Sequence, residues 1–141
     1  MNTKILTDEK DLLKLEKLRC EVFDLDQASV YYTNELLTKN AYAMAAYIED
    51  ELVGGCYFHN FNKTLMIDQL FVKEKYQNTG LRIGRSILTE LMSNKEVLNK
   101  LFDEDVTVCR IESDNEKAHA LYSKMGFRES KNDEDTFYKS I

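Results

Sequence analysis

A strand-like segment that leads through a glycine-bearing turn into a helix is the first feature of this sequence that could do chemistry. Residues 65–72 read LMIDQLFV, residues 73–85 read KEKYQNTGLRIGR, and apolar positions at helical spacing follow. Backbone N–H groups converge at such a turn, and the helix dipole adds roughly half a positive charge at the first helical residues. The segment therefore predicts an anion site such as a phosphate site, although many helices simply begin after a glycine.

Asp68 is the one carboxylate inside the strand-like segment 65–72. A carboxylate among apolar residues needs solvent, a charged partner or a chemical role. It could act as a general base or hold an amine, or it could be a solvated or salt-bridged residue, and the sequence leaves both interpretations open. Gln69 beside it cannot titrate and could only position a ligand.

The cysteines and histidines do not form a metal-binding pattern. Cys20, Cys56 and Cys109 are far apart, no CxxC spacing occurs, and only His59 and His119 could complete a metal site. Thiols in this pattern most often pack in a core in the reduced state. We therefore expect reduced core cysteines and no metal.

Composition and charge limit the classes of protein to consider. The 141 residues fit one domain, residues 1–141, and the chain is 43% hydrophobic with a net charge of −6 and a pI near 5.0. A nucleic-acid binder would carry a basic face, so we expect no nucleic-acid partner. An acidic chain can steer a cationic amine toward itself, although many proteins are acidic only for solubility.

The N-terminus lacks the apolar run of a signal peptide, and no window approaches the roughly eighteen apolar residues of a membrane span. We expect a cytoplasmic protein without a membrane partner.

Hydrophobic periodicity predicts the elements that must position these residues. Gly54-Gly55 marks a bulge or a close approach of the backbone. Residues 95–102 either extend the preceding helix or form a separate turn, and a short helix at 34–38 is a further option. The order is αβββαβαβ, which predicts an α/β fold with helices packed on a mixed sheet. The expected strands are 41–48, 51–60, 65–72, 105–112 and 136–141, and the helices are 8–23, one running to about residue 94, and one capped by residues 113–115 and ended by Gly126.

Two segments resemble the motifs of one family. Residues 115–127, NEKAHALYSKMGF, resemble the N-x-x-A-x-x-L-Y-x-K-x-G-F pattern of the GNAT N-acetyltransferase superfamily. The loop 76–84 resembles that family's acyl-CoA pyrophosphate loop, Q/R-x-x-G-x-G/A, and 65–72 resembles its central strand. The resemblance implies an α/β GNAT-like fold, with a mixed, mostly antiparallel central sheet of about six to seven strands and helices on both faces.

The resemblance also implies a reaction, the transfer of an acetyl group from acetyl-CoA to an amine by direct attack. A primary amine has a pKa of about 10.4, so a base must remove a proton, and the departing thiolate needs a proton donor. Tyr122 matches the family's tyrosine and is the expected acid. From its spacing alone, Tyr122 would simply pack on the apolar face of its helix. Asp68 is the expected base or amine-positioning group.

The cofactor residues follow from the same resemblance. The main chain of Leu70, Phe71 and Val72 is expected to pair with the pantetheine arm, and Asn115 to contact the cofactor or to serve only as an N-cap. After Gly80 the family has one residue before its second glycine, whereas this chain has Leu81, Arg82 and Ile83 before Gly84. We interpret Leu81-Arg82 as a two-residue insertion, which changes the N–H groups that face the pyrophosphate. The expected pyrophosphate loop comprises Gln77, Asn78, Thr79, Gly80, Ile83, Gly84 and Arg85.

Three functional hypotheses remain open at this point. The first is an N-acetyltransferase acting on a primary amine of a small molecule or peptide. The second is an acyl-CoA-binding regulatory module with little turnover, which the loop insertion favours, and the third is an interaction domain without a cofactor. We expect the acceptor to be bound by residues 24–40 and 128–136, since loops usually supply such contacts. The exposed edges of the predicted sheet allow a homodimer.

Overall fold

The computed structural model describes residues 1–25, 41–79 and 82–141. The chain forms two compact units. The first comprises Met1–Phe58 with Gln69–Leu91, and the second comprises His59–Asp68 with Met92–Ile141. A single domain over residues 1–141 therefore stays a prediction. The helix expected at 34–38 lies outside the described residues.

The described strands form a mixed sheet in the order β1-β2-β3-β4-β5-β7-β6. β4 and β5 are parallel, whereas β1 with β2, β2 with β3, β5 with β7 and β6 with β7 are antiparallel. The prediction of a mixed, mostly antiparallel α/β sheet is confirmed. The strands are β1 (Asn2–Leu6), β2 (Tyr42–Ile48), β3 (Glu51–Phe61), β4 (Thr64–Val72), β5 (Val108–Glu112), β6 (Arg128–Glu129) and β7 (Thr136–Ser140).

The helices agree with the periodicity of the sequence. The segment 95–102, for which two interpretations were open, forms a separate helix. No helix in the described ranges is long and apolar enough to cross a membrane. The helices are α1 (Glu9–Val22), the short 3-10 helix η1 (Glu74–Tyr76), α3 (Ile83–Ser93), α4 (Lys95–Phe102) and α5 (Glu116–Lys124).

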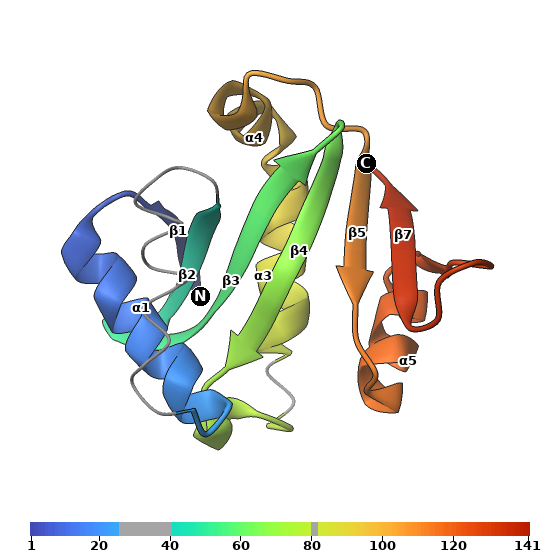
Figure 1. The fold of residues 1–141 in the computed structure, drawn as a ribbon. Helices are drawn as coiled ribbons and strands as arrows, with labels where there is room; N and C mark the ends of the chain where they lie inside the picture. Colours follow the sequence, from blue (N-terminus) through green and yellow to red (C-terminus); the bar gives the residue numbers. More distant parts are fainter. Residues whose placement is uncertain (26–40, 80–81) are drawn as a thin grey trace. The chain divides into compact units, whose positions relative to one another are not determined.

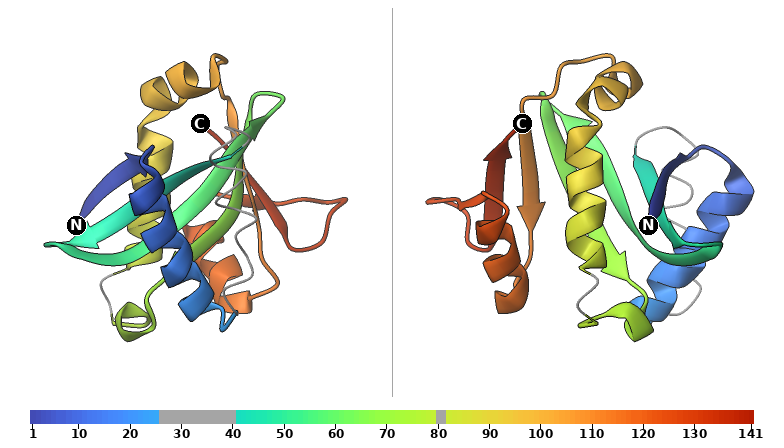
Figure 2. Two further views of the ribbon diagram at one scale, coloured as in Figure 1. Left: turned by 60° about the vertical axis from the view of Figure 1, so that its left-hand side comes forward. Right: turned by 180° about the vertical axis from the view of Figure 1, so that it is seen from behind.

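In the first unit, α1 and α3 lie on opposite faces of the strands (Figure 1 and Figure 2). The glycine pair of β3 permits this because adjacent strand residues point to opposite faces. A Cβ on Gly55 would lie 2.5 Å from Leu15 Cδ1 of α1, and a Cβ on Gly54 would lie 3.2 Å from Ile87 Cδ1 of α3. The β2–β3 register also shifts between Ala46 and Tyr47. A Cβ on Gly54 would also lie 2.7 Å from Phe71 O, and one on Gly55 would lie 2.9 Å from Met44 O. The expected close backbone approach is therefore confirmed, and both backbone and side chains of the protein cause it.

The second unit contains the hairpin turn that joins β3 to β4. Asn62 and Lys63 have φ values of 50° and 64°. Two consecutive left-handed residues are typical of the tight turn that matches the twist of antiparallel strands. The carbonyl of Lys63 accepts a hydrogen bond of 2.9 Å from Thr107 N, just before β5.

Three details of the expected element order were wrong. β1 precedes the first helix, and the two-residue strand β6 precedes β7, although neither was predicted. Both are short strands that pair with a neighbouring strand, so their formation depends on tertiary pairing rather than on local propensity. The strand predicted at 105–112 begins only at Val108, because Val106 N donates to Asn99 Oδ1 at 2.9 Å and Thr107 N to Lys63.

Candidate active site

The approach to the predicted pyrophosphate loop is anchored by Glu51, the first residue of β3. Its carboxylate accepts hydrogen bonds from Tyr76 Oη at 2.6 Å, Lys75 Nζ at 2.9 Å and Lys73 Nζ at 3.1 Å. The Tyr76 hydroxyl, followed by the two lysines, lowers the pKa of Glu51 to about 2. This cluster ties η1, which follows β4, to the start of β3. Both lysines are therefore paired with Glu51.

Inside the loop, two side chains expected to hold the cofactor brace the backbone. Gln77 Nε2 donates to the carbonyl of Val72 at 2.7 Å, and Thr79 Oγ1 donates to the carbonyl of Tyr76 at 2.9 Å. Asn78 has a φ of 59°, in the left-handed region that asparagine tolerates best among residues with a side chain. Gly80, also assigned to the pyrophosphate, lies outside the described residues, as does Leu81.

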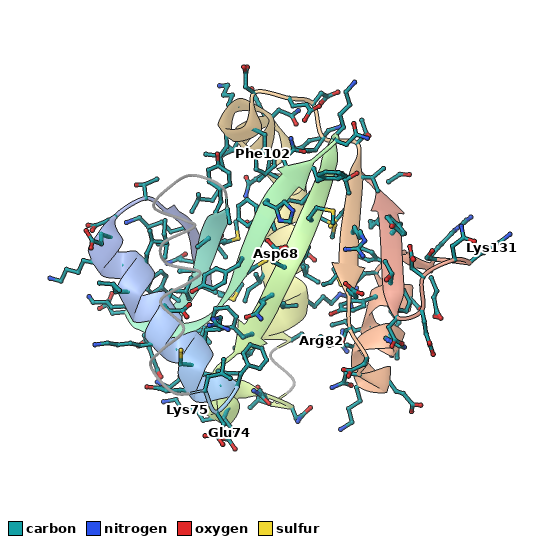
Figure 3. The ribbon with its side chains drawn as sticks, viewed as in Figure 1. Asp68, Glu74, Lys75, Arg82, Phe102 and Lys131 are labelled. Carbon is teal, nitrogen blue, oxygen red and sulfur yellow. The ribbon has the colours of Figure 1, made fainter. Side chains whose placement is uncertain are left out.

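The first turn of α3 lies beside a hollow of about 560 Å³ in the first unit. Both arginines of this part of the chain line the hollow: Arg82, which stands at φ 53° directly before the helix, and Arg85. Figure 3 shows Arg82 at the end of the loop. A helix N-terminus with two guanidinium groups is a favourable place for a phosphate, because the helix dipole and the side chains carry the same sign of charge. The remaining lining residues are Met1, Ser86, Thr89 and Glu90.

Gly84, in the first turn of α3, faces the last part of β4. A Cβ placed there would lie 3.7 Å from Leu70 Cδ2 and 3.8 Å from Val72 Cγ2, so the position has room for alanine. Ile83 beside it is buried. Phe71 points to the other face and packs edge-on against the ring of Tyr57, with centroids 5.6 Å apart. Phe71 therefore belongs to the core, while Leu70 and Val72 are half-buried against α3, which leaves the main chain of the segment able to pair with a ligand.

A buried charged network in the first unit was not foreseen from the sequence. Arg19 is 2% exposed and donates to Glu16 through Nε at 3.0 Å and Nη2 at 2.7 Å. Tyr57 Oη donates to Glu16 Oε2 at 2.5 Å, and Arg19 Nη1 donates to Gln69 Oε1 at 3.0 Å. Burial, followed by the bond to Glu16, raises the pKa of Tyr57 far above its ordinary value, so its hydroxyl stays a neutral donor. Gln69 is thus held by α1.

In the second unit, Asp68 forms an ion-pair-type contact with a histidine. His59 Nδ1 lies 2.7 Å from Asp68 Oδ2, and the two side chains are 33% and 26% exposed. Figure 3 shows Asp68 in the middle part of β4. Asp68 is therefore paired, while its role as a base or amine-positioning group stays a prediction. His59 was missed as a functional candidate, although the hairpin turn at residues 62–63 brings it near Asp68.

Asn115 and Tyr122 lie at the start and near the end of α5. Asn115 Oδ1 accepts from the backbone N–H of Lys117 at 2.9 Å, so it is a helix cap as well as a candidate ligand contact. Tyr122 is 5% exposed, and its ring packs against Phe127 and Phe137 with centroid distances of 5.8 and 5.6 Å. Packing of Tyr122 is therefore observed, while its role as an acid stays a prediction.

The end of α5 explains how Tyr122 is fixed. Phe127 N donates to the Tyr122 carbonyl at 2.9 Å and Gly126 N to the Ser123 carbonyl at 3.1 Å, with Gly126 at φ 94°. These two bonds and the aromatic contact across them form the Schellman type of helix end. The left-handed glycine cap predicted from the sequence is confirmed.

The sequence model of the acetyltransferase (GNAT) family matches residues 9–127. The chain belongs to this family. Its structure is similar to that of the PaiA N-acetyltransferase of Thermoplasma acidophilum, solved with coenzyme A, at 18% identity over 100% of both chains and a TM-score of 0.73. It is also similar to the ribosomal-protein-alanine N-acetyltransferase of Brucella melitensis, at 17% identity over 100% of both chains and a TM-score of 0.70.

A third similar structure is an aminoglycoside 6′-N-acetyltransferase solved with coenzyme A, which is 14% identical over 99% of this chain and 97% of that one, with a TM-score of 0.73. At these identities the likeness establishes the GNAT fold. No curated protein sequence matches the chain significantly. The resemblance inferred from the two motifs is confirmed, and this GNAT protein is an acyl-CoA-dependent acetyltransferase by family.

The two units of this GNAT protein hold different parts of the predicted machinery. The first unit contains Leu70–Val72, the described part of the loop and the start of α3. The second contains Asp68, Asn115 and Tyr122, together with the predicted acceptor loop at 128–136. The other predicted acceptor segment, 24–40, lies almost entirely outside the described residues.

Proposed function

We propose that this protein transfers an acetyl group from acetyl-CoA to the primary amine of a small molecule or peptide, by direct attack of the amine on the thioester. The observation that carries the proposal is the loop between β4 and α3. It is anchored by Glu51, and the helix that follows begins beside a hollow lined by Arg82 and Arg85. An anchored first part of the loop and two cations at a helix N-terminus fit a pyrophosphate.

In the first unit, the residues proposed to act are those that bind and orient. Arg82, Arg85 and the first N–H groups of α3 would neutralise phosphate oxygens. The main chain of Leu70–Val72 would pair with the amide groups of the pantetheine arm as an added strand does. Val72 O already accepts from Gln77 Nε2. We therefore assign the pairing chiefly to the other backbone groups of this segment.

In the second unit, the proposed residues move protons. The amine nitrogen forms a bond to the thioester carbonyl carbon, the C–S bond breaks, and its electron pair leaves on sulfur. Tyr122 Oη would donate a proton to that sulfur, and the amine would lose its proton to a base in the region of Asp68. Asn115 would contribute a side-chain contact at the start of α5. A buried tyrosine held by a fixed helix end suits this role, because its hydroxyl cannot swing away.

One observation favours the alternative, an acyl-CoA-binding regulatory or interaction module with little turnover. Arg82 adopts a φ of 53°, which a residue with a long side chain seldom adopts, and it belongs to the two-residue insertion. An altered loop would bind the co-substrate in a position less suited to transfer.

The test combines binding with turnover. Acetyl-CoA is titrated by calorimetry, and thiol release is then followed with a panel of primary amines. Tyr122→Phe should lower kcat about 100-fold or more, the usual scale of general acid catalysis, with little change in the Kd of acetyl-CoA. Tyr138→Phe, a half-buried tyrosine of β7 in the same unit, is the matched control and should leave kcat unchanged.

Each other outcome has a definite meaning. Unchanged kcat in Tyr122→Phe rejects its role as the acid. Binding without thiol release supports the regulatory module, and failure to bind acetyl-CoA at millimolar concentration rejects both functions.

A further inference from the structure

The His59–Asp68 pair of the second unit has the geometry of a base held by a carboxylate. His59 Nδ1 lies 2.7 Å from Asp68 Oδ2. A carboxylate accepts the proton of the nitrogen that faces it, so this contact favours the tautomer with hydrogen on Nδ1 and the lone pair on Nε2. A histidine oriented in this way by an acid is a recurrent general base.

The second ring nitrogen is in a position to act. In the part of the chain that the structure describes, no residue forms a hydrogen bond with His59 Nε2, and the side chain is 33% exposed. The imidazole is therefore oriented by one nitrogen and open to solvent or a ligand at the other. Such an arrangement holds a proton acceptor ready without burying it.

His119 provides a comparison within the same unit. Its Nε2 is within bonding reach of the Ser113 carbonyl and lies 3.3 Å from Asp135 Oδ1, and its ring packs on Phe137 with centroids 4.8 Å apart. That histidine ties the end of β5 to the loop before β7. Both histidines contact an aspartate, but only His59 leaves Nε2 available to an incoming group among the described residues.

The place of the pair along the chain suits the proposed reaction. Asp68 precedes Leu70 by two residues, which is about 7 Å of extended chain. Leu70 begins the segment proposed to pair with the pantetheine arm. A neutral imidazole with a free ring nitrogen is a common proton acceptor in catalysis, and a neighbouring carboxylate commonly orients it.

Resting on the proposed acetyl transfer, we infer that His59 is its general base and that Asp68 is the positioning residue that fixes the imidazole tautomer. His59 Nε2 takes a proton from the attacking amine, whose nitrogen forms the bond to the acetyl carbon while the C–S bond breaks. Asp68 stabilises the resulting imidazolium through Nδ1–H and takes no proton itself. The sequence-based assignment of Asp68 as the base is thereby replaced.

The experiment uses the alkylamine that the wild-type protein acetylates best and measures kcat and the Kd of acetyl-CoA for His59→Ala, His59→Gln and Asp68→Asn. His119→Gln is the matched control, because it removes another histidine that contacts an aspartate. Because His59 is one-third exposed, added imidazole can enter the space left in His59→Ala. Circular dichroism and the urea midpoint of each variant identify any that fail to fold.

We expect His59→Ala to lose about 100-fold or more in kcat, with the Kd of acetyl-CoA unchanged and activity partly restored by imidazole. Asp68→Asn should lower kcat by at least about tenfold, since an amide can donate to Nδ1 and stabilise the wrong tautomer. His119→Gln should retain its kcat.

A folded His59→Ala or His59→Gln variant with kcat within about threefold of wild type overturns the inference. A loss of kcat in His59→Ala that added imidazole does not restore also overturns it. If the wild-type protein acetylates no amine, the proposed function itself has failed, which is a different result from an active His59→Ala.

Discussion

Replacing Arg19 by methionine tests whether the buried network of the first unit is a main determinant of stability. The substitution removes the guanidinium that donates to Glu16 and Gln69. Glu16, which is only 6% exposed in the wild-type structure, then keeps its carboxylate without this cation. Breaking a buried ion pair by removing one partner costs about 3–5 kcal/mol, because the remaining charge stays buried without its counterion. Since small domains are stable by about 5–15 kcal/mol, this loss is a large fraction of the total.

The network also predicts how the other members behave. Tyr57→Phe removes one neutral donor to Glu16 and should cost about 1.5–3 kcal/mol, the usual worth of a hydrogen bond to a charged group. The combined variant Glu16→Leu, Arg19→Met and Tyr57→Phe removes all three polar groups together. It should recover most of the loss seen in Arg19→Met, because Glu16, the carboxylate that Arg19 pairs with, is then no longer left as an unpaired buried charge.

Urea unfolding followed by circular dichroism gives the free energy of unfolding of each variant, and the slope of the transition shows whether it stays two-state. The reasoning is refuted if Arg19→Met loses less than about 1 kcal/mol. It is equally refuted if the combined variant is less stable than Arg19→Met, since the cost would then come from lost packing rather than from an unpaired charge.

Three further predictions follow from contacts elsewhere in the described chain. Gly55→Ala should lose about 1–3 kcal/mol in urea unfolding, because its Cβ would lie 2.5 Å from Leu15 Cδ1. Gly84→Ala has room for a methyl group and should gain up to about 1 kcal/mol, and equal effects of the two substitutions would contradict the packing described. The pKa of Glu51 is lowered from its ordinary value of 4.5 to about 2 in the folded protein. The bonds of its carboxylate therefore stabilise the fold at pH values above 4.5, and this contribution is lost as the pH falls from 4.5 toward 2. The urea midpoint of Glu51→Gln should change less across that pH range than the urea midpoint of the wild type. Burial raises the pKa of the Cys109 thiol to about 12. A thiol-specific reagent at mildly alkaline pH should therefore leave Cys109 unmodified in the folded protein and label it after denaturation. Rapid labelling of Cys109 in the folded protein would show that the thiol is not buried.

The features that could be predicted from the sequence are those set by neighbouring residues. Asn115 caps α5, and Gly126 ends it in a left-handed conformation, because both roles depend on residue type over one helical turn. The signature that spans them was enough to identify the family. The alternating strands 41–48 and 51–60 were likewise found, because one tight turn joins them.

The features that could not be predicted depend on contacts between distant segments. Arg19 and Gln69 are fifty residues apart, and no local pattern marks them as partners. β1 is recognised only through its pairing with β2. His59 is an intermediate case: a two-residue turn at 62–63 implies that β3 and β4 run side by side, so its nearness to Asp68 could have been derived from the hairpin.

The measurement that tests the central claim most directly is mass spectrometry of primary amines incubated with the protein and acetyl-CoA that carries an isotopic label in its acetyl group. The account predicts that at least one amine gains the label on nitrogen, in step with an equal amount of free CoA thiol, and that Tyr122→Phe slows both. If acetyl-CoA binds but no amine gains the label above the control without protein, while thiol stays esterified, this chain is not an N-acetyltransferase for those acceptors and the binding-module interpretation replaces it.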